Sequence, residues 1–122
     1  MKVIVAHSDR QYCNQLLLAL AEKNWLLRFY TMFSANKFSR LNSLLPRRVR
    51  HMLRKRAVDA SLTPHIRHFP WILLANRFSG KNLYCSIQTT YRQFDRRVAD
   101  CLQTENFDLV ITYENANLET LK

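Results

Sequence analysis

The sequence predicts an α/β fold built on a short parallel sheet of about three strands. Three short apolar runs begin at Lys2, Leu26 and Leu109, and stretches in which apolar residues recur at helical spacing separate them. Apolar runs of this length are typical of strands that are buried on both faces of a parallel sheet. Strands that alternate with helices along the chain favour parallel pairing.

The first run, from Lys2 to Ala6, is apolar and β-branched and predicts a strand. The next residues, Ser8 to Gln11, fit a capping box, in which two side chains satisfy backbone N–H groups at the start of a helix. Apolar positions at helical spacing extend this helix to about Asn24, and they are Cys13, Leu16, Leu17 and Leu20. Leu26 to Phe33 predicts a second strand, and a strand–helix–strand unit of this length predicts parallel neighbours.

From about residue 34 to residue 90 the sequence predicts a basic helical insertion. One helical face is apolar and consists of Leu41, Leu44, Leu45, Val49, Met52 and Leu53. Arginine and lysine crowd the other faces, and no acidic residue lies between Arg40 and Val58. Because proline suits the first turn of a helix better than its interior, Pro46 predicts a break and a main basic helix that runs to about Ala57.

The following segments predict loops and two helices. Pro64 to Pro70 has the character of a loop, Trp71 to Phe78 predicts a short buried helix, and Gly80 to Thr90 has the character of a loop. Helical spacing returns from about Tyr91 to Glu105, at Phe94, Val98, Cys101 and Leu102. This last helix leads into the third apolar run.

The third strand, Leu109 to Ile111, ends in the polar residues Thr112 to Asn115, and Asn115 suits the cap of a further helix. Together the elements predict a partial Rossmann-like fold of three layers, with helices on both faces of the sheet. Residues 1–122 form a single domain in this interpretation. A sheet of about three strands leaves apolar edges poorly covered, so we expect this domain to be an incomplete, amino-terminal part of a larger one.

The charge balance indicates an anionic partner. The 19 lysines and arginines against 9 acidic residues leave a net charge of +10. Such an excess favours nucleic acid, an acidic membrane or a phosphorylated ligand. The single glycine, Gly80, excludes a glycine-rich phosphate loop of the P-loop or dinucleotide type, and we expect no bound cofactor.

The cysteines and the hydropathy pattern bear on the compartment. Cys13, Cys85 and Cys101 are widely spaced and form no C-x-x-C motif, which indicates reduced thiols in the cytosol. The apolar start is too short for a signal peptide, and no stretch approaches the roughly 20 apolar residues that a membrane span needs. We therefore expect a cytoplasmic protein that is soluble or at most bound peripherally to the inner face of the membrane.

The polar residues that follow the strands are the candidate site. If the first strand lies between the other two, the strand order reverses there, and open α/β sheets bind ligands at such a switch point. The crevice at this point would be lined by His7, Ser8, Arg10, Tyr113, Glu114 and Asn115. We assign His7 and Glu114 to catalysis, as groups that orient a hydroxylated acceptor or take its proton, and the other four residues to acceptor binding. In the alternative interpretation Asn115 only caps a helix and Tyr113 packs beside it.

Two further groups of residues have a binding and a structural interpretation. The basic helix offers a contact for a membrane or another anion through Arg47, Arg48, Arg50, Arg54, Lys55 and Arg56. The alternative is a solvated helix face on a basic protein. His65 and His68 form an H-x-x-H pair, but no cysteine or acidic residue lies close by, so we expect no metal site.

Three motifs carry a resemblance to a known family. They are the opening strand into Arg10-Gln11-Tyr12, the strand with Phe29-Tyr30-Thr31, and Phe94-Asp95 with Val98-Ala99 leading into Phe107 to Asn115. In these motifs the chain resembles the amino-terminal domain of retaining nucleotide-sugar glycosyltransferases of the two-Rossmann-domain (GT-B) type, similar to family 4. The segment from about residue 34 to 90 matches only in being basic and helical.

The resemblance implies an amino-terminal domain that binds a hydroxylated acceptor and a carboxyl-terminal domain that holds the nucleotide-sugar through a spaced pair of glutamates. This second domain is absent from the chain, which would then be inactive alone; the complete enzyme would transfer a hexosyl group. The nearest pair here, Glu105 and Glu114, flanks one strand and would be roughly 30 Å apart, too far to share a ligand. Several members of the family bind acidic membranes through a basic amino-terminal domain, which agrees with the basic helix.

A second interpretation is a small basic protein that binds nucleic acid or a membrane surface without catalysis. The basic segment lacks interleaved aromatic residues, and the chain has no helix-turn-helix or RNA-binding signature, which argues against nucleic acid. Membrane-surface binding without catalysis stays open beside the glycosyltransferase interpretation.

Overall fold

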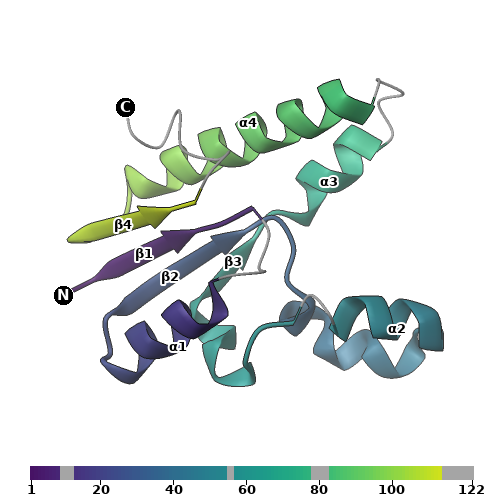
Figure 1. Cartoon of the computed structure of the whole chain (residues 1–122), viewed down its shortest axis with the longest axis horizontal. Helices are drawn as coiled ribbons and strands as arrows, with labels where there is room; N and C mark the ends of the chain where they lie inside the picture. The colour runs from purple at the N-terminus through teal and green to yellow at the C-terminus, as the bar shows by residue number, and fades with distance from the viewer. Residues whose placement is uncertain (9–12, 55–56, 78–82, 114–122) are drawn as a thin grey trace.

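Four parallel strands form one sheet at the centre of the molecule (Figure 1). The computed structural model describes residues 1–8, 13–54, 57–77 and 83–113, without the side chains of residues 38–42, 52, 76, 77 and 83–87. The strands are β1 (Val3–Ala6), β2 (Leu26–Thr31), β3 (Ile66–His68) and β4 (Leu109–Thr112). Their order is β3-β2-β1-β4, so β1 lies between β2 and β4. The predicted parallel α/β fold and the reversal of strand order at β1 are confirmed.

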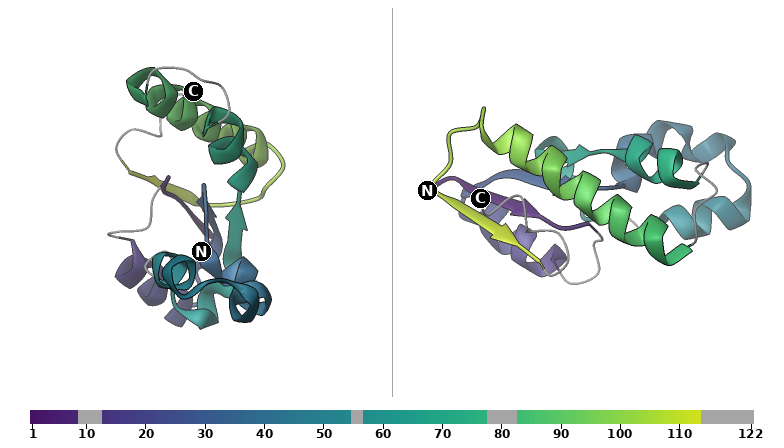
Figure 2. Two further views of the ribbon diagram at one scale, coloured as in Figure 1. Left: turned by 90° about the vertical axis from the view of Figure 1, so that its right-hand side faces the viewer. Right: turned by 90° about the horizontal axis from the view of Figure 1, so that it is seen from above.

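Helices cover both faces of this sheet, as Figure 2 shows with the strands nearly edge-on. In chain order they are α1 (Asn14–Glu22), the 3-10 helix η1 (Ala35–Leu44), α2 (Arg47–Arg54), the 3-10 helix η2 (Ala60–His65), α3 (Pro70–Arg77) and α4 (Leu83–Leu102). Figure 1 places α1 on one side of the sheet and α3 with α4 on the other. The three predicted layers are therefore present.

The alternation of side chains along β1 supplies two apolar cores. Val3 and Val5 point to one face, where they pack with residues of α1 and η2 such as Leu17 and Leu62. Ile4 and Ala6 point to the other face and pack with residues of α3 and α4 that include Ile72, Phe94 and Val98. All nine of these residues are completely buried, and burial of each large side chain contributes about 1.5–3 kcal/mol.

The sheet has one strand more than predicted. Ile66–His68 was expected to be a loop, but it forms β3 and pairs in parallel with Phe29–Thr31 of β2. Its two flanking prolines, Pro64 and Pro70, lie outside the strand, where a missing N–H removes no sheet hydrogen bond. Because β3 belongs to the sheet, the segment from about residue 34 to 90 is not one continuous helical insertion.

The helices differ from prediction mainly at their ends. Helix α4 begins at Leu83, within the segment that was expected to be a loop, and ends at Leu102. The basic helix α2 ends at Arg54 and does not reach Ala57, although the predicted break at Pro46 is present between η1 and α2.

Two further predictions differ from the structure. Strand β2 ends at Thr31, two residues before Phe33, where the sequence predicted its end. Helix α3 was predicted to be buried, but Trp71 and Leu74 are 52% and 56% exposed.

His68, the last residue of β3, makes the stability of the folded protein depend on pH. The half-buried imidazole of His68 accepts a hydrogen bond at Nδ1 from the backbone N–H of Ser34, at 3.4 Å. Burial lowers the pKa of His68 below its ordinary value of 6.5, and the positive charge of Lys37 lowers it further. The folded protein therefore binds this proton more weakly than the unfolded chain does.

We predict that part of the stability is lost as the pH falls from 6.5 through the lowered pKa of His68. The contribution is fully present above pH 6.5, because both states are then unprotonated at this residue. His68→Asn keeps an acceptor oxygen for Ser34 and removes the titration, so its unfolding free energy should fall less over this range. Urea unfolding followed by circular dichroism at several pH values measures the difference, and equal pH dependence in both proteins would contradict the prediction.

Candidate functional site

The switch point predicted from the strand order lies where β1 and β4 end. The parallel register pairs Ala6 with Thr112, so the next two residues, His7 and Tyr113, leave the sheet beside each other. Their ring centroids are 4.6 Å apart, and the ring planes are tilted by 56°. The backbone N–H of His7 also donates to the carbonyl oxygen of Tyr30 at 3.0 Å, which ties the residue to β2. Two of the predicted site residues therefore meet at the switch point.

The phenol of Tyr113 lies in a partly buried environment. The ring is half-buried and packs against the apolar core on the α1 side of the sheet. Burial raises the pKa of Tyr113, and the nearby Cys13 thiol raises it further. Tyrosine is neutral at neutral pH even without this shift, so the phenol can donate one hydrogen bond and accept another. The packing of the ring agrees with the structural alternative, so the binding interpretation depends on the hydroxyl.

The remaining site residues are only partly covered by the structure. Ser8 follows His7 and is half-buried. Arg10, Glu114 and Asn115, together with most of the proposed capping box, lie outside the described residues. Their roles stay predictions from the sequence.

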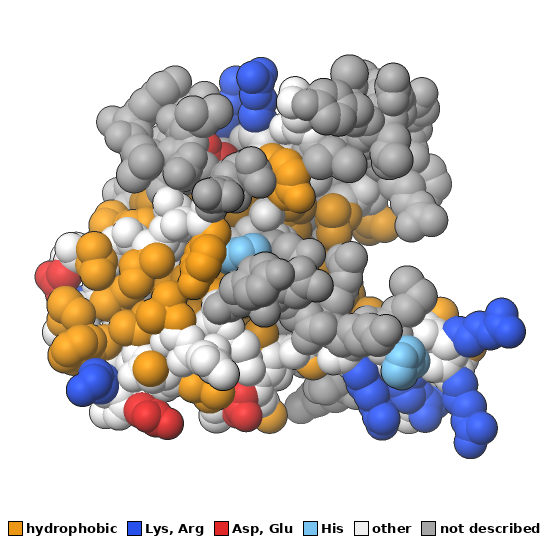
Figure 3. Space-filling view, viewed as in Figure 1, with side chains coloured by type: hydrophobic (Ala, Val, Ile, Leu, Met, Phe, Trp, Pro, Cys, Tyr) orange, Lys and Arg blue, Asp and Glu red, His pale blue; other side chains and the backbone are white. Residues whose placement is uncertain are grey.

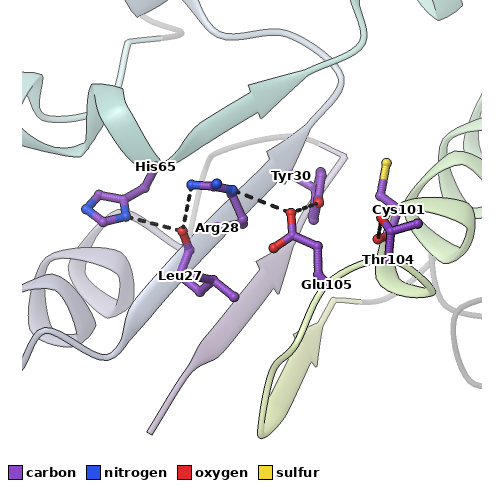
Figure 4. Close-up of polar contacts among 7 residues, drawn as sticks. All are labelled: Leu27, Arg28, Tyr30, His65, Cys101, Thr104 and Glu105. Carbon is purple, nitrogen blue, oxygen red and sulfur yellow. Dashed lines mark hydrogen bonds and ion pairs between the residues drawn. The ribbon is translucent and has the colours of Figure 1, made fainter.

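A polar cluster that the sequence analysis did not predict fixes the loop between α4 and β4 (Figure 4). The Tyr30 hydroxyl donates to Oε1 of Glu105 at 2.9 Å, and the Arg28 Nε lies 3.4 Å from the same oxygen. Burial and then Glu105 raise the pKa of Tyr30. Glu105 thus has two partners on β2, and we assign it a structural role.

The basic residues of η1 and α2 form a lobe that projects beyond the sheet in Figure 1; we call residues 35–54 the basic lobe. Arg47, Arg48 and Arg54 are exposed, and lysine and arginine side chains gather over α2 at the lower right of Figure 3. Two large apolar side chains of the lobe are also exposed, Leu44 by 79% and Val49 by 40%. The apolar side of this segment is therefore not fully used in packing.

Arg50 differs from the other arginines of the lobe. One of its terminal nitrogens donates to the carbonyl oxygens of Ser43 and Leu45, at 3.3 and 3.1 Å. These bonds satisfy carbonyl groups where η1 ends. Lys55 and Arg56, which were predicted to act with Arg50, lie outside the described residues.

The side chain of Asn36, at the start of the basic lobe, forms hydrogen bonds with residues that follow the lobe in the sequence. The Asn36 side chain accepts from the backbone N–H of Val58 and donates to its carbonyl oxygen, both at 3.0 Å. It also donates to the hydroxyl of Thr63 at 3.2 Å. The start of the lobe is therefore joined to Val58 and Thr63, which follow the lobe in the sequence.

The two histidines of the H-x-x-H pair contact backbone groups. Nδ1 of His65 lies 3.3 Å from the carbonyl oxygen of Leu27, and Nδ1 of His68 accepts from Ser34. Across the part of the chain that the structure describes, no three His, Cys, Asp or Glu side chains come together as metal ligands would. In the same ranges, no helix combines the length and the apolar character that crossing a membrane requires.

Comparisons of the chain with protein-family models, with curated proteins and with solved structures found no match. The functional argument therefore rests on the residues of this chain and on their arrangement.

Proposed function

We propose that the chain is the acceptor-binding amino-terminal part of a nucleotide-sugar-dependent glycosyltransferase. One observation carries the proposal: the strand order reverses at β1, and His7 and Tyr113 are in contact at this reversal. Crevices at such reversals are the usual ligand sites of open parallel sheets. The neutral Tyr113 hydroxyl and the His7 imidazole offer donors and acceptors to a sugar-like hydroxyl.

In this proposal His7 and Glu114 orient the acceptor hydroxyl or take its proton, with Tyr113 beside them. Ser8, Arg10 and Asn115 complete the contacts with the acceptor. The nucleotide-sugar would be held by a second domain that contains the spaced glutamates, so we expect no transfer by the 122-residue chain alone. The resemblance in sequence motifs supports this assignment of acceptor binding to the amino-terminal domain and of nucleotide-sugar binding to the second domain.

The reading frame that follows codon 122 in the source DNA tests the enzyme proposal. We expect it to continue through a second domain with a spaced glutamate pair.

In that complete protein, Glu114→Gln should lower kcat for sugar transfer by roughly 100-fold or more, because a general base contributes about that much. Glu22→Gln, the same change at an exposed site on α1, is the matched control and should leave kcat unaltered. Full activity of Glu114→Gln, or a gene that ends without a second domain, would contradict the proposal.

A second candidate function is binding of an anionic membrane surface by the basic lobe. The observation that favours it is the combination of exposed Leu44 and Val49 with the exposed arginines of α2. An amphipathic basic helix with this exposure suits the boundary between lipid headgroups and acyl chains. This function is compatible with the enzyme proposal, and it would also stand without catalysis.

We predict that replacing Arg47, Arg48 and Arg54 together by Gln weakens binding to vesicles that contain phosphatidylglycerol. Each basic residue near such a surface contributes about 1 kcal/mol, so the triple variant should bind roughly 100-fold more weakly. The matched control replaces the exposed Arg67, Arg92 and Arg96, which removes the same charge from β3 and α4. Sedimentation with vesicles measures both. Equal loss in the two variants, or tighter binding to duplex DNA at the same salt, would contradict specific membrane binding by the lobe.

A further inference from the structure

Helix α3 presents a ridge of two large apolar side chains to solvent. Trp71 is 52% exposed and Leu74 is 56% exposed, and residues three apart lie on the same side of a helix. Ile72, between them, is completely buried in the core with Phe94 and Val98. The ridge is therefore on the outer side of a helix whose inner side is anchored to the sheet.

The ridge and the basic lobe lie at the same end of the molecule. Helix α3 begins directly after β3, and the lobe begins shortly after β2, so both follow the carboxyl ends of parallel strands. In Figure 1 both α2 and α3 lie beyond the arrowheads of the strands, and the end-on view of Figure 2 looks onto both of them. Exposed apolar residues therefore lie on two separate segments at this end of the molecule, Leu44 with Val49 and Trp71 with Leu74.

The distribution of charge supports an anionic surface at this end. Between Glu22 and Asp95 the single acidic residue of the sequence is Asp59. Its carboxylate accepts hydrogen bonds from the backbone N–H and the hydroxyl of Ser61, at 2.9 and 2.6 Å. Of the other acidic residues that the structure describes, Asp95 is buried, and four belong to the opposite end, where α1 and α4 finish and β4 begins: Glu22, Asp100, Glu105 and Asp108. An anionic surface would therefore attract the end that carries α2 and α3.

We infer that Trp71 and Leu74 insert into the interface of an anionic lipid bilayer while the arginines of the lobe bind its headgroups. This inference rests on the membrane function proposed for the lobe, and it adds a second contact on α3 that fixes the orientation of the protein. Tryptophan is favoured at the level of the headgroups, because its ring is apolar and its N–H is polar. Nucleic acid offers no apolar layer for Leu74, and a second copy of this chain would bring two charges of +10 together.

The two tryptophans of the chain make the orientation measurable. Trp25 directly precedes β2 at the amino end of the sheet, whereas Trp71 lies beyond the carboxyl end. Trp25→Phe leaves Trp71 as the single fluorophore, and Trp71→Phe leaves Trp25, which is 37% exposed. Both variants keep an aromatic ring at the altered position, and the two proteins are matched controls for each other.

The experiment adds vesicles of phosphatidylcholine and phosphatidylglycerol with brominated acyl chains, which quench tryptophan at short range. We expect the fluorescence of Trp71 in the Trp25→Phe protein to shift to shorter wavelength and to be quenched. Trp25 in the Trp71→Phe protein should keep its emission. Leu74→Ala should lower the vesicle partition coefficient roughly three- to tenfold, since part of a leucine side chain is no longer buried in lipid.

Sedimentation of the same samples separates this inference from the function on which it rests. Binding without quenching of Trp71, or with quenching of Trp25, would overturn the orientation and leave binding by the lobe intact. Absence of binding by every variant would overturn both. A blue shift of Trp71 that depends on protein concentration without lipid would indicate self-association through the ridge and would also overturn the inference.

Discussion

The central position of β1 is the constraint on which the rest of the structure depends. Its four residues, Val3 to Ala6, are completely buried, pair with strands on both sides and supply side chains to both cores. With β2 and β3 on one side of β1 and β4 on the other, the chain must return across the sheet, and α3 and α4 cover the face along which it returns. The meeting of His7 and Tyr113 is a consequence of this same reversal.

The spacing of apolar residues along the sequence predicted the strands and helices that bury several apolar side chains. Strand β3 could not be predicted in this way, because it has three residues, of which only Ile66 is buried, and its stability comes from pairing with β2. The start of α4 was missed for a different reason. Leu83, Ile87 and Tyr91 precede Phe94 at helical spacing, so the sequence carries the helical signal, but the segment that begins at Gly80 was assigned to a loop.

The candidate site was predictable only where it follows from strand order. His7 and Tyr113 directly follow β1 and β4, so a parallel register alone brings them together. Glu105 and Asn36 could not be assigned, because their partners Tyr30 and Val58 are 75 and 22 residues away in the sequence. The exposure of Trp71 was also missed, because an apolar helix that bears both a buried and an exposed side has the composition of a buried one.

The contact between His7 and Tyr113 tests the account most directly, because it requires both the strand order and the register. Nuclear Overhauser spectroscopy of the isotope-labelled chain measures it through the ring protons of the two residues. The account predicts cross-peaks between the imidazole and the phenol, as their centroid separation of 4.6 Å requires, and their loss in Tyr113→Leu. A folded chain without these cross-peaks would contradict the switch-point crevice and the function proposed for it.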